Sequence, residues 1–255
     1  MAGLVTSEYG IVGRSLPQPT PDGIEREQRL GRYGSVITEL LSATKHGLAD
    51  EGAYFVATNA TPGTAQAYNI QASFSDTTPF MYLFNKDQPA NSANKRIYLD
   101  YVKIIVTTAA ATGTQAYYAV KADAARAITT NNTATITAVN SNMDSGTQSI
   151  ATLNAQNSGT ASVIAAASSS ARIVARGGFG GITIVGDELV MMFGTCDPGA
   201  YPGLTAAQAT APGRKVSVSP PIILGPQQSA TIQLWFPGNA TTGLSYEFEA
   251  GWWER

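Results

Sequence analysis

Residues 216–255 read VSVSPPIILGPQQSATIQLWFPGNATTGLSYEFEAGWWER, and this stretch decides the fold class. Apolar and polar side chains alternate along 230–236 and again along 245–253. Successive side chains of a β-strand point to opposite faces, so a period of two indicates strands with one apolar face each. The residues predicted to face a core are Ile232, Leu234, Phe236, Tyr246, Phe248, Ala250 and Trp252. Thr231 and Gln233 share the opposite face of the first strand, and Glu247 and Glu249 that of the second.

Upstream of this stretch the chain is strand-like from about residue 53 onward. The candidate segments are rich in β-branched or aromatic residues and are bounded by Gly, Pro, Asn, Asp or Ser. They are 53–58, 80–85, 96–108, 115–122, 133–139, 162–166, 171–175, 181–185, 188–194 and 215–219. About a dozen short strands separated by turn signals predict an all-β sandwich or barrel. The Ala-, Thr-, Ser- and Asn-rich middle, about 109–170, suits a half-exposed sheet with polar loops.

The first 50 residues have a different pattern. Pro17, Pro19 and Pro21 hold residues 1–23 extended, as an arm without a core of its own. Its apolar residues then rest on the body of the chain or on a neighbour, the alternative being a floppy terminus. From Asp22 to about Gly47, apolar residues recur every three or four positions and predict one or two short helices, most clearly at 35–45 and ending near Gly47. The predicted units are an arm with a short helix, 1–50, and a β-sandwich, 51–255.

Composition excludes several classes of function. The chain has 255 residues, with 16 basic and 18 acidic side chains, and a net charge of −2. Only 13% of its residues are charged, against about 25% in ordinary soluble domains, and no basic patch is present, so direct nucleic-acid binding is not expected. The 44% of hydrophobic residues suffice for a folded core. No apolar run approaches the roughly 18 residues of a membrane helix, so no membrane association is expected.

Candidate catalytic groups are few, and we predict that the chain is not an enzyme. His46 is the only histidine and Cys196 the only cysteine, so they cannot form a zinc site alone. A catalytic Cys196 could take only His46 as its histidine base, and we expect a small buried side chain at a strand end instead. Glu247 and Glu249 lie roughly 7 Å apart on one strand face, near the carboxylate separation of inverting glycosidases. The solvent-exposed face of an ordinary sheet produces the same alternation of polar residues without any catalytic role.

The remaining motifs predict no cofactor and no metal. GGFGG at 177–181 matches no phosphate-binding loop and indicates a Gly-rich hairpin or a close backbone approach. The aspartates form no calcium-loop motif, although a calcium site built from separate loops stays open. Asn59, Asn131 and Asn239 begin N-x-[ST] triplets, which a Thr-rich chain generates by chance, and we expect no glycosylation.

The C-terminal order of PPIILGPQQS, the strand ATIQLWF, the turn PGNATTG and a closing strand resembles the end of a jelly-roll in virion proteins. With the Pro-rich arm, the polar small-residue middle and the low charge, the whole chain resembles a structural protein of a tailed bacteriophage. Within that group it is similar to minor capsid, cement or decoration proteins of the head. The resemblance is of style across most of the chain and identifies no functional residue.

The resemblance implies a jelly-roll-like antiparallel β-sandwich with an extended N-terminal arm and one or two short helices. It also implies a non-enzymatic protein that attaches to a capsid and stabilises it, is assembled in the host cytoplasm and is located in the virion. The partners would be the major capsid protein or other virion proteins, together with further copies of this chain, a trimer being the expected oligomer. The arm residues expected to contact a neighbour are Leu4, Tyr9, Ile11, Val12, Leu16, Pro17, Pro19 and Pro21.

Two alternatives use other residues. In a tail-fibre or adhesin-type receptor-binding protein, Tyr201 or Trp253 would stack on surface glycans. In a glycan-cleaving enzyme, Glu247 or Glu249 would supply the carboxylates.

Overall fold

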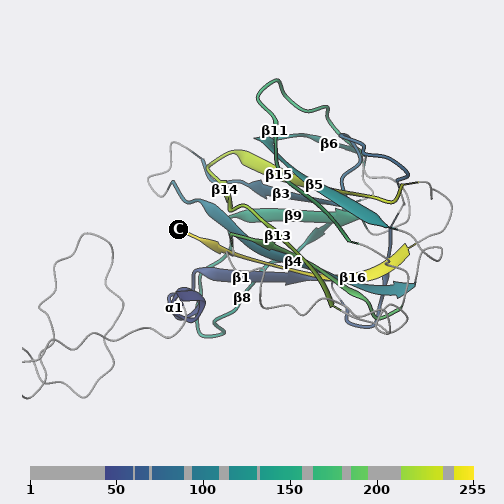
Figure 1. The fold of residues 1–255 in the computed structure, drawn as a ribbon. Helices are drawn as coiled ribbons and strands as arrows, with labels where there is room; N and C mark the ends of the chain where they lie inside the picture. The colour runs from purple at the N-terminus through teal and green to yellow at the C-terminus, as the bar shows by residue number, and fades with distance from the viewer. Residues whose placement is uncertain are drawn as a thin grey trace, which may run out of the picture.

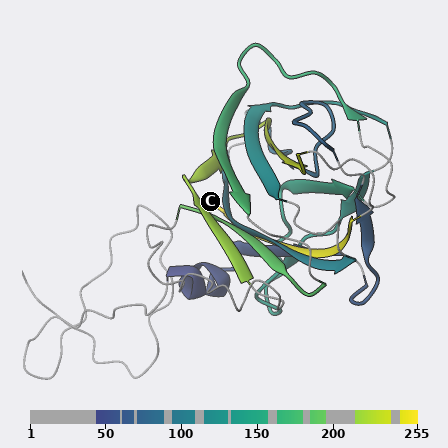
Figure 2. The same ribbon diagram turned by 45° about the vertical axis from the view of Figure 1, so that its right-hand side comes forward.

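The protein is a β-sandwich in which two sheets pack face to face (Figure 1). The computed structural model describes residues 44–59, 61–68, 71–88, 94–108, 115–130, 133–156, 163–179, 185–194, 214–237 and 244–255. Seen after a 45° turn, the two sheets curve around a common interior (Figure 2). The all-β prediction is therefore confirmed.

The first sheet has eight strands. Its main path runs through β13 (Arg214–Ser219), β12 (Glu188–Phe193), β4 (Ile97–Thr108), β16 (Leu244–Glu254), β1 (Tyr54–Thr58) and β8 (Val139–Asn140). Two short strands lie off this path, β14 (Ile222–Leu224) paired with β4 and β2 (Gln66–Tyr68) paired with β16. All of these pairs are antiparallel except β12 with β13, which is parallel.

The second sheet has six strands and is antiparallel throughout. Its order is β11 (Arg172–Phe179), β5 (Ala116–Ala124), β15 (Gln228–Trp235), β3 (Met81–Asn85), β9 (Ala151–Gln156) and β7 (Thr133–Ile136). A separate two-stranded sheet pairs β10 (Val163–Ile164) with β6 (Ile128–Thr130). The two C-terminal strands thus occupy inner positions of different sheets, β16 between β4 and β1, and β15 between β5 and β3.

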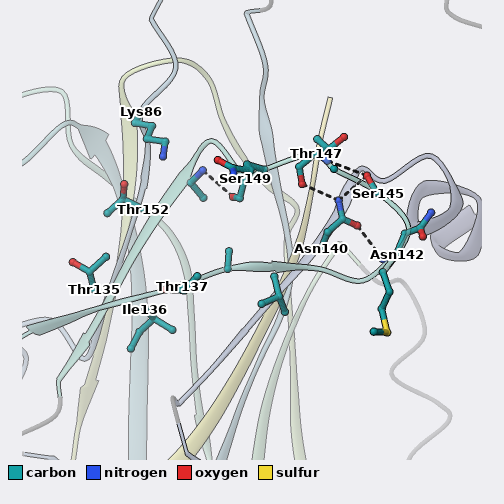
Figure 3. Close-up of a pocket in the computed structure, with 16 residues that line it drawn as sticks. Lys86, Thr135, Ile136, Thr137, Asn140, Asn142, Ser145, Thr147, Ser149 and Thr152 are labelled. Carbon is teal, nitrogen blue, oxygen red and sulfur yellow. Dashed lines mark hydrogen bonds between the residues drawn. The ribbon is translucent and has the colours of Figure 1, made fainter.

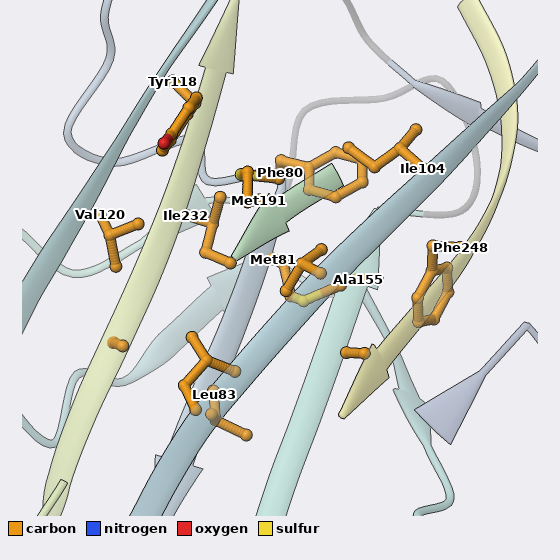
Figure 4. Packing of buried hydrophobic residues seen from close by; sticks show 14 of the residues in the cluster. Phe80, Met81, Leu83, Ile104, Tyr118, Val120, Ala155, Met191, Ile232 and Phe248 are labelled. Carbon is orange, nitrogen blue, oxygen red and sulfur yellow. The ribbon is translucent and has the colours of Figure 1, made fainter. Parts of the chain in front are cut away.

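The core lies between the two sheets and takes side chains from both (Figure 4). Phe248 and Ile104 come from the eight-stranded sheet, and Ile232 and Val120 from the six-stranded sheet. Trp252 is fully buried in the same cluster, as predicted. Apolar burial at about 25 cal/mol per Å² makes this layer the main source of folding free energy.

The outer face of β15 differs from the prediction. Thr231 and Gln233 were expected on a face opposite the core, yet both side chains are as buried as the apolar residues that alternate with them. The segment 71–79 covers this face, because the Phe74 ring contacts Trp235 and the Asp76 carboxylate contacts Lys121 of β5. The six-stranded sheet is therefore buried on both sides along β15.

The helix α1 (Thr44–Asp50) continues past Gly47, so the prediction that the helix ends there is wrong. It ends in a Schellman motif, in which Ala53 N donates to Leu48 O and Gly52 N donates to Ala49 O, both at 2.9 Å. Gly52 adopts the left-handed φ of +67° that this motif needs. The glycine that ends the helix is therefore Gly52, five residues after the predicted Gly47. Most of the predicted helical segment lies outside the described residues.

Several strand boundaries also differ. The predicted strand 133–139 is two strands in different sheets, because β7 pairs with β9 whereas β8 pairs with β1. The predicted strand 171–175 runs on through Phe179 as β11. Four strands were not predicted, namely β2, β6, β9 and β14. Of the predicted strand 181–185, only Val185 is described, and it lies in a turn.

Candidate functional site

The two glutamates considered as a catalytic pair hold the surface of the eight-stranded sheet together. Glu247 Oε1 accepts a 2.9 Å hydrogen bond from Gly63 N. Glu249 forms a 2.8 Å ion pair with Lys103 and accepts a hydrogen bond from the Tyr101 hydroxyl. Burial opposes ionisation of Glu249, but the Lys103 and Tyr101 hydrogen bonds outweigh it and hold its pKa below the usual value. Glu249 is thus a paired, ionised carboxylate at neutral pH.

A β-bulge places two tyrosines over the backbone beside Glu249. The register of β16 against β4 shifts between Gly251 and Trp252, which leaves Asp100 as the extra residue. Tyr54 donates a 2.7 Å hydrogen bond to Asp100. A Cβ on Gly251 would lie 2.4 Å from the Tyr101 ring and 2.7 Å from the Tyr54 hydroxyl oxygen. Burial, and then the neighbouring carboxylates, raise the pKa of both tyrosines.

A second charged cluster ties the covering segment to the six-stranded sheet. Lys121 lies 2.7 Å from Asp76, and Arg126 Nη2 donates to the Asp76 backbone carbonyl at 2.9 Å. Arg126 also lies 4.0 Å from Asp123, and the two side chains are only 2% and 1% exposed. Burial opposes ionisation of both aspartates, yet hydrogen bonds, from Lys121 to Asp76 and from Ser168 to Asp123, leave each pKa below its usual value. This cluster is an ionic network with a buried half, Arg126 and Asp123, and a half-buried one, Lys121 and Asp76.

Three aromatic side chains form a row on the outer surface of the six-stranded sheet. The Trp235 ring stacks on Tyr117, with centroids 6.0 Å apart, and meets the edge of Phe74 at 5.6 Å. Phe74 and Tyr117 are 39% and 37% exposed. Next to them Gly178 lies under Tyr117, where a Cβ would sit 3.1 Å from the ring. Exposed aromatic rings are enriched at binding surfaces of proteins.

A polar hollow lies inside the wide hairpin formed by residues 133–156 (Figure 3). It has a volume of about 640 Å³, within the range of about 300–1,000 Å³ typical of small-molecule sites. The hollow exists because the chain leaves the six-stranded sheet after Ile136, joins the other sheet at Val139, and returns only at Ala151. Most lining side chains carry hydroxyl or amide groups, and Lys86 supplies the one cation.

The framework of this hollow is fixed by hydrogen bonds. Asn140 donates to the carbonyls of Gly52 and Thr147, at 2.8 and 3.2 Å, and so bridges the two arms of the hairpin. Asn142 donates to Asp50 at the end of α1. Ser149 donates to Glu254, a buried residue near the C-terminus whose carboxylate also accepts from the Trp252 indole. The hollow is therefore braced by the helix end and by the last strand.

The sequence-derived candidates have different outcomes. The arm residues from Leu4 to Pro21, together with Cys196, Tyr201, Asn131 and Asn239, lie outside the described residues. His46 lies inside α1, not at its end. Trp253 stacks on Tyr98, with centroids 5.5 Å apart, on an inner strand and not at a sheet edge. Asn59 is buried; its side-chain Nδ2 donates a hydrogen bond to Thr61 O, and its Oδ1 accepts one from Phe248 N.

The glycine-rich segment is a close backbone approach over the part that is described. A Cβ on Gly177 would lie 2.6 Å from Ser217 Oγ and 2.7 Å from the Tyr118 ring. At Gly177 the close approach is therefore that of the Tyr118 and Ser217 side chains to the glycine backbone. The aromatic row was not identified from the sequence, because its residues come from segments far apart in the chain. The polar hollow was missed although all its lining residues but Lys86 lie within 135–152, because the division of this segment between two sheets was not predicted.

Within the described ranges no group of three or more His, Cys, Asp or Glu side chains is placed to hold a metal ion. The one helix that the structure describes has seven residues, and no described helix could cross a membrane. Comparison with protein-family models, with curated proteins and with solved structures gives no match for this chain.

Proposed function

We propose that this chain is a non-enzymatic structural protein of a tailed-bacteriophage virion, which attaches to the capsid and stabilises it as a minor capsid, cement or decoration protein. Its jelly-roll-like connectivity, its location in the virion and its self-association, with a trimer as the expected oligomer, belong to the same proposal. The major capsid protein or other virion proteins are the proposed partners. The sequence resemblance and the surface of the sandwich support it.

The observation that carries this proposal is the distribution of exposed apolar side chains. Among the residues described they are spread over several surfaces: Phe74, Tyr117, Val139, Met143, Ile173, Val185 and Ile223. Meanwhile several charged groups are paired within the chain, such as Lys103 with Glu249 and Lys215 with Asp187. A neutral surface with scattered apolar groups suits many small contacts, which multiple copies add together.

The first experiment is quantitative mass spectrometry of purified particles, giving copies of this chain per copy of the major shell protein. A ratio near one, or a simple fraction of it, is expected for a lattice-wide role. A handful of copies per particle would favour a tail or fibre location. Complete absence from particles would contradict the proposal.

The arm is tested separately by deleting residues 1–21. The truncated chain is expected to keep the unfolding transition of the sandwich and to lose binding to shells that lack this protein. The residues held responsible are Leu4, Tyr9, Ile11, Val12, Leu16, Pro17, Pro19 and Pro21. Shell binding that survives the deletion would contradict the arm model while leaving attachment through the sandwich open to the first experiment.

A second candidate, a receptor-binding protein of the tail, is favoured by the aromatic row. Phe74 and Tyr117, which contact the half-buried Trp235 ring, offer exposed ring surface on which sugar faces could stack. This function predicts glycan-array binding that is lost in Tyr117→Ala and kept in Trp253→Ala, because the Trp253 ring already stacks on Tyr98. Absence of glycan binding by the intact chain would contradict it.

A further inference from the structure

The polar hollow of the 133–156 hairpin combines a single cation with neutral hydrogen-bonding groups. Lys86 is exposed at its border, and the described residues offer its ammonium group no ion pair (Figure 3). None of the sixteen lining residues is Asp or Glu. Lys86 is therefore the one charged side chain of the lining, and the nearby Glu254 carboxylate is bonded to Ser149 and to Ile150 N, while Asp144 lies between two lining residues.

The lining side chains divide into two sets. Asn140, Asn142 and Ser149 use their polar groups to hold the hairpin in shape. Thr137, Gln148 and Thr152 line the same hollow, and the described residues give their side chains no hydrogen-bond partner. One set fixes the shape, and the other is available to a ligand.

We propose that this hollow binds an acidic saccharide, with Lys86 contacting the sugar carboxylate and Thr137 and Thr152 contacting ring hydroxyls. Threonine hydroxyls donate and accept hydrogen bonds, as sugar hydroxyls do, so the threonine and sugar hydroxyls are complementary. A carboxylate beside an unpaired ammonium forms a charge-assisted hydrogen bond. The inference is independent of capsid attachment.

The lining disfavours other anionic ligands. Tight phosphate sites commonly combine Arg forks or several converging backbone N–H groups with lysine, whereas this hollow has a single lysine and no arginine. Apolar ligands need an apolar lining, and hydroxyl and amide groups dominate here. The rigid brace to α1 and β16 means that the hollow exists before the ligand arrives, which lowers the entropic cost of binding.

The test titrates the full chain with trigalacturonate and, as a matched neutral ligand, with its methyl ester, by calorimetry and by backbone amide shifts. The acid is expected to bind about tenfold more tightly than the ester, which corresponds to one charge-assisted hydrogen bond. The shifted amides are expected to lie at 86 and within 135–152.

Three variants locate the binding. Lys86→Gln is expected to remove the preference for the acid, and Lys86→Arg to keep most of it. Lys95→Gln removes the same charge from a lysine outside the lining and is expected to leave the preference unchanged. Thr137→Val with Thr152→Val is expected to weaken acid and ester alike, since these hydroxyls contact the ring and not the carboxylate.

Each contrary result overturns the proposal. These are absence of binding by either ligand, equal affinity for acid and ester, an unchanged preference in Lys86→Gln, and shifts that cluster on Phe74, Tyr117 and Trp235 instead. Lys86 is exposed, so its variants are expected to keep the unfolding midpoint of the parent chain. Absence of saccharide binding would leave the copy number of the chain in particles unaffected, so saccharide binding and capsid attachment are tested separately.

Discussion

The hydroxyl oxygen of Tyr118 lies 2.6 Å from the Oγ of Ser219, and this contact joins the two sheets of the sandwich. Tyr118 belongs to β5 of the six-stranded sheet and Ser219 to β13 of the eight-stranded sheet. The same hydroxyl lies 2.8 Å from Ser217 Oγ. Between them Gly177 of β11 lets the strands approach, because any side chain there would meet Tyr118 and Ser217. A polar contact therefore closes this side of an apolar core.

Replacing Tyr118 with Phe keeps the ring in the core and removes both hydrogen bonds. Ser219 is buried and would be left without this partner, so unfolding free energy is expected to fall by about 1–3 kcal/mol. Tyr117→Phe is the matched control, since its hydroxyl contacts only the exposed Gln115, and a loss below about 0.5 kcal/mol is expected. Urea denaturation of both variants measures the difference. Equal losses would show that the cross-sheet contact adds nothing.

Replacing Gly251 with Ala tests the packing of the tyrosines over β16. The added Cβ would lie 2.4 Å from the Tyr101 ring, which is held by its hydrogen bond to Glu249. Displacing that ring is expected to lower the unfolding free energy by about 1–3 kcal/mol. Gly146→Ala, where no atom lies within 4 Å of the new Cβ, is expected to leave stability nearly unchanged. A tolerated Gly251→Ala would contradict the close packing described here.

Most of the longer strands were predictable from local pattern, whereas β9, several short strands and all strand partners were not. Alternation along 245–253 identified β16 and the burial of Trp252, because a one-sided strand leaves a period of two. The same rule failed at Thr231 and Gln233, since segment 71–79 covers the second face of β15. The sequence around β15 carries no sign that a segment about 155 residues earlier in the chain covers its outer face.

For the functional candidates too, local placement was predictable and long-range partners were not. Glu247 and Glu249 were correctly placed on one strand face, but their partners Gly63, Tyr101 and Lys103 come from other segments. The split of 133–139 between two sheets creates the polar hollow, and a change of sheet leaves no mark in a continuous run of Thr, Ala, Ile and Val. Long-range pairing, not composition, produces both sites.

Stability is expected to fall in acid because of the network around Asp76. The folded-state pKa of Asp76 lies below its ordinary value of 3.8, so its contribution is complete well above pH 3.8 and is lost as pH falls below it. Asp76→Asn is expected to lower the urea midpoint at pH 6 and to flatten its decline between pH 5 and 2.5. Asp144→Asn, an exposed side chain, is the control and is expected to keep the parent slope. An unchanged slope in Asp76→Asn would contradict this role.

Stability is also expected to fall in alkali because of Tyr101. Burial, and then the hydrogen bond to Glu249, raise its pKa in the folded state above the ordinary value of 10.0. The unfolded chain therefore ionises first, so the stabilisation is complete below pH 10 and is lost as pH rises above it. Tyr101→Phe is expected to flatten the decline of the urea midpoint between pH 9 and 11.5. Tyr98→Phe keeps the stacked ring against Trp253 and serves as the control, with a decline expected to match that of the parent chain. A parent chain whose midpoint stays constant to pH 11.5 would contradict a raised pKa of Tyr101 in the folded state.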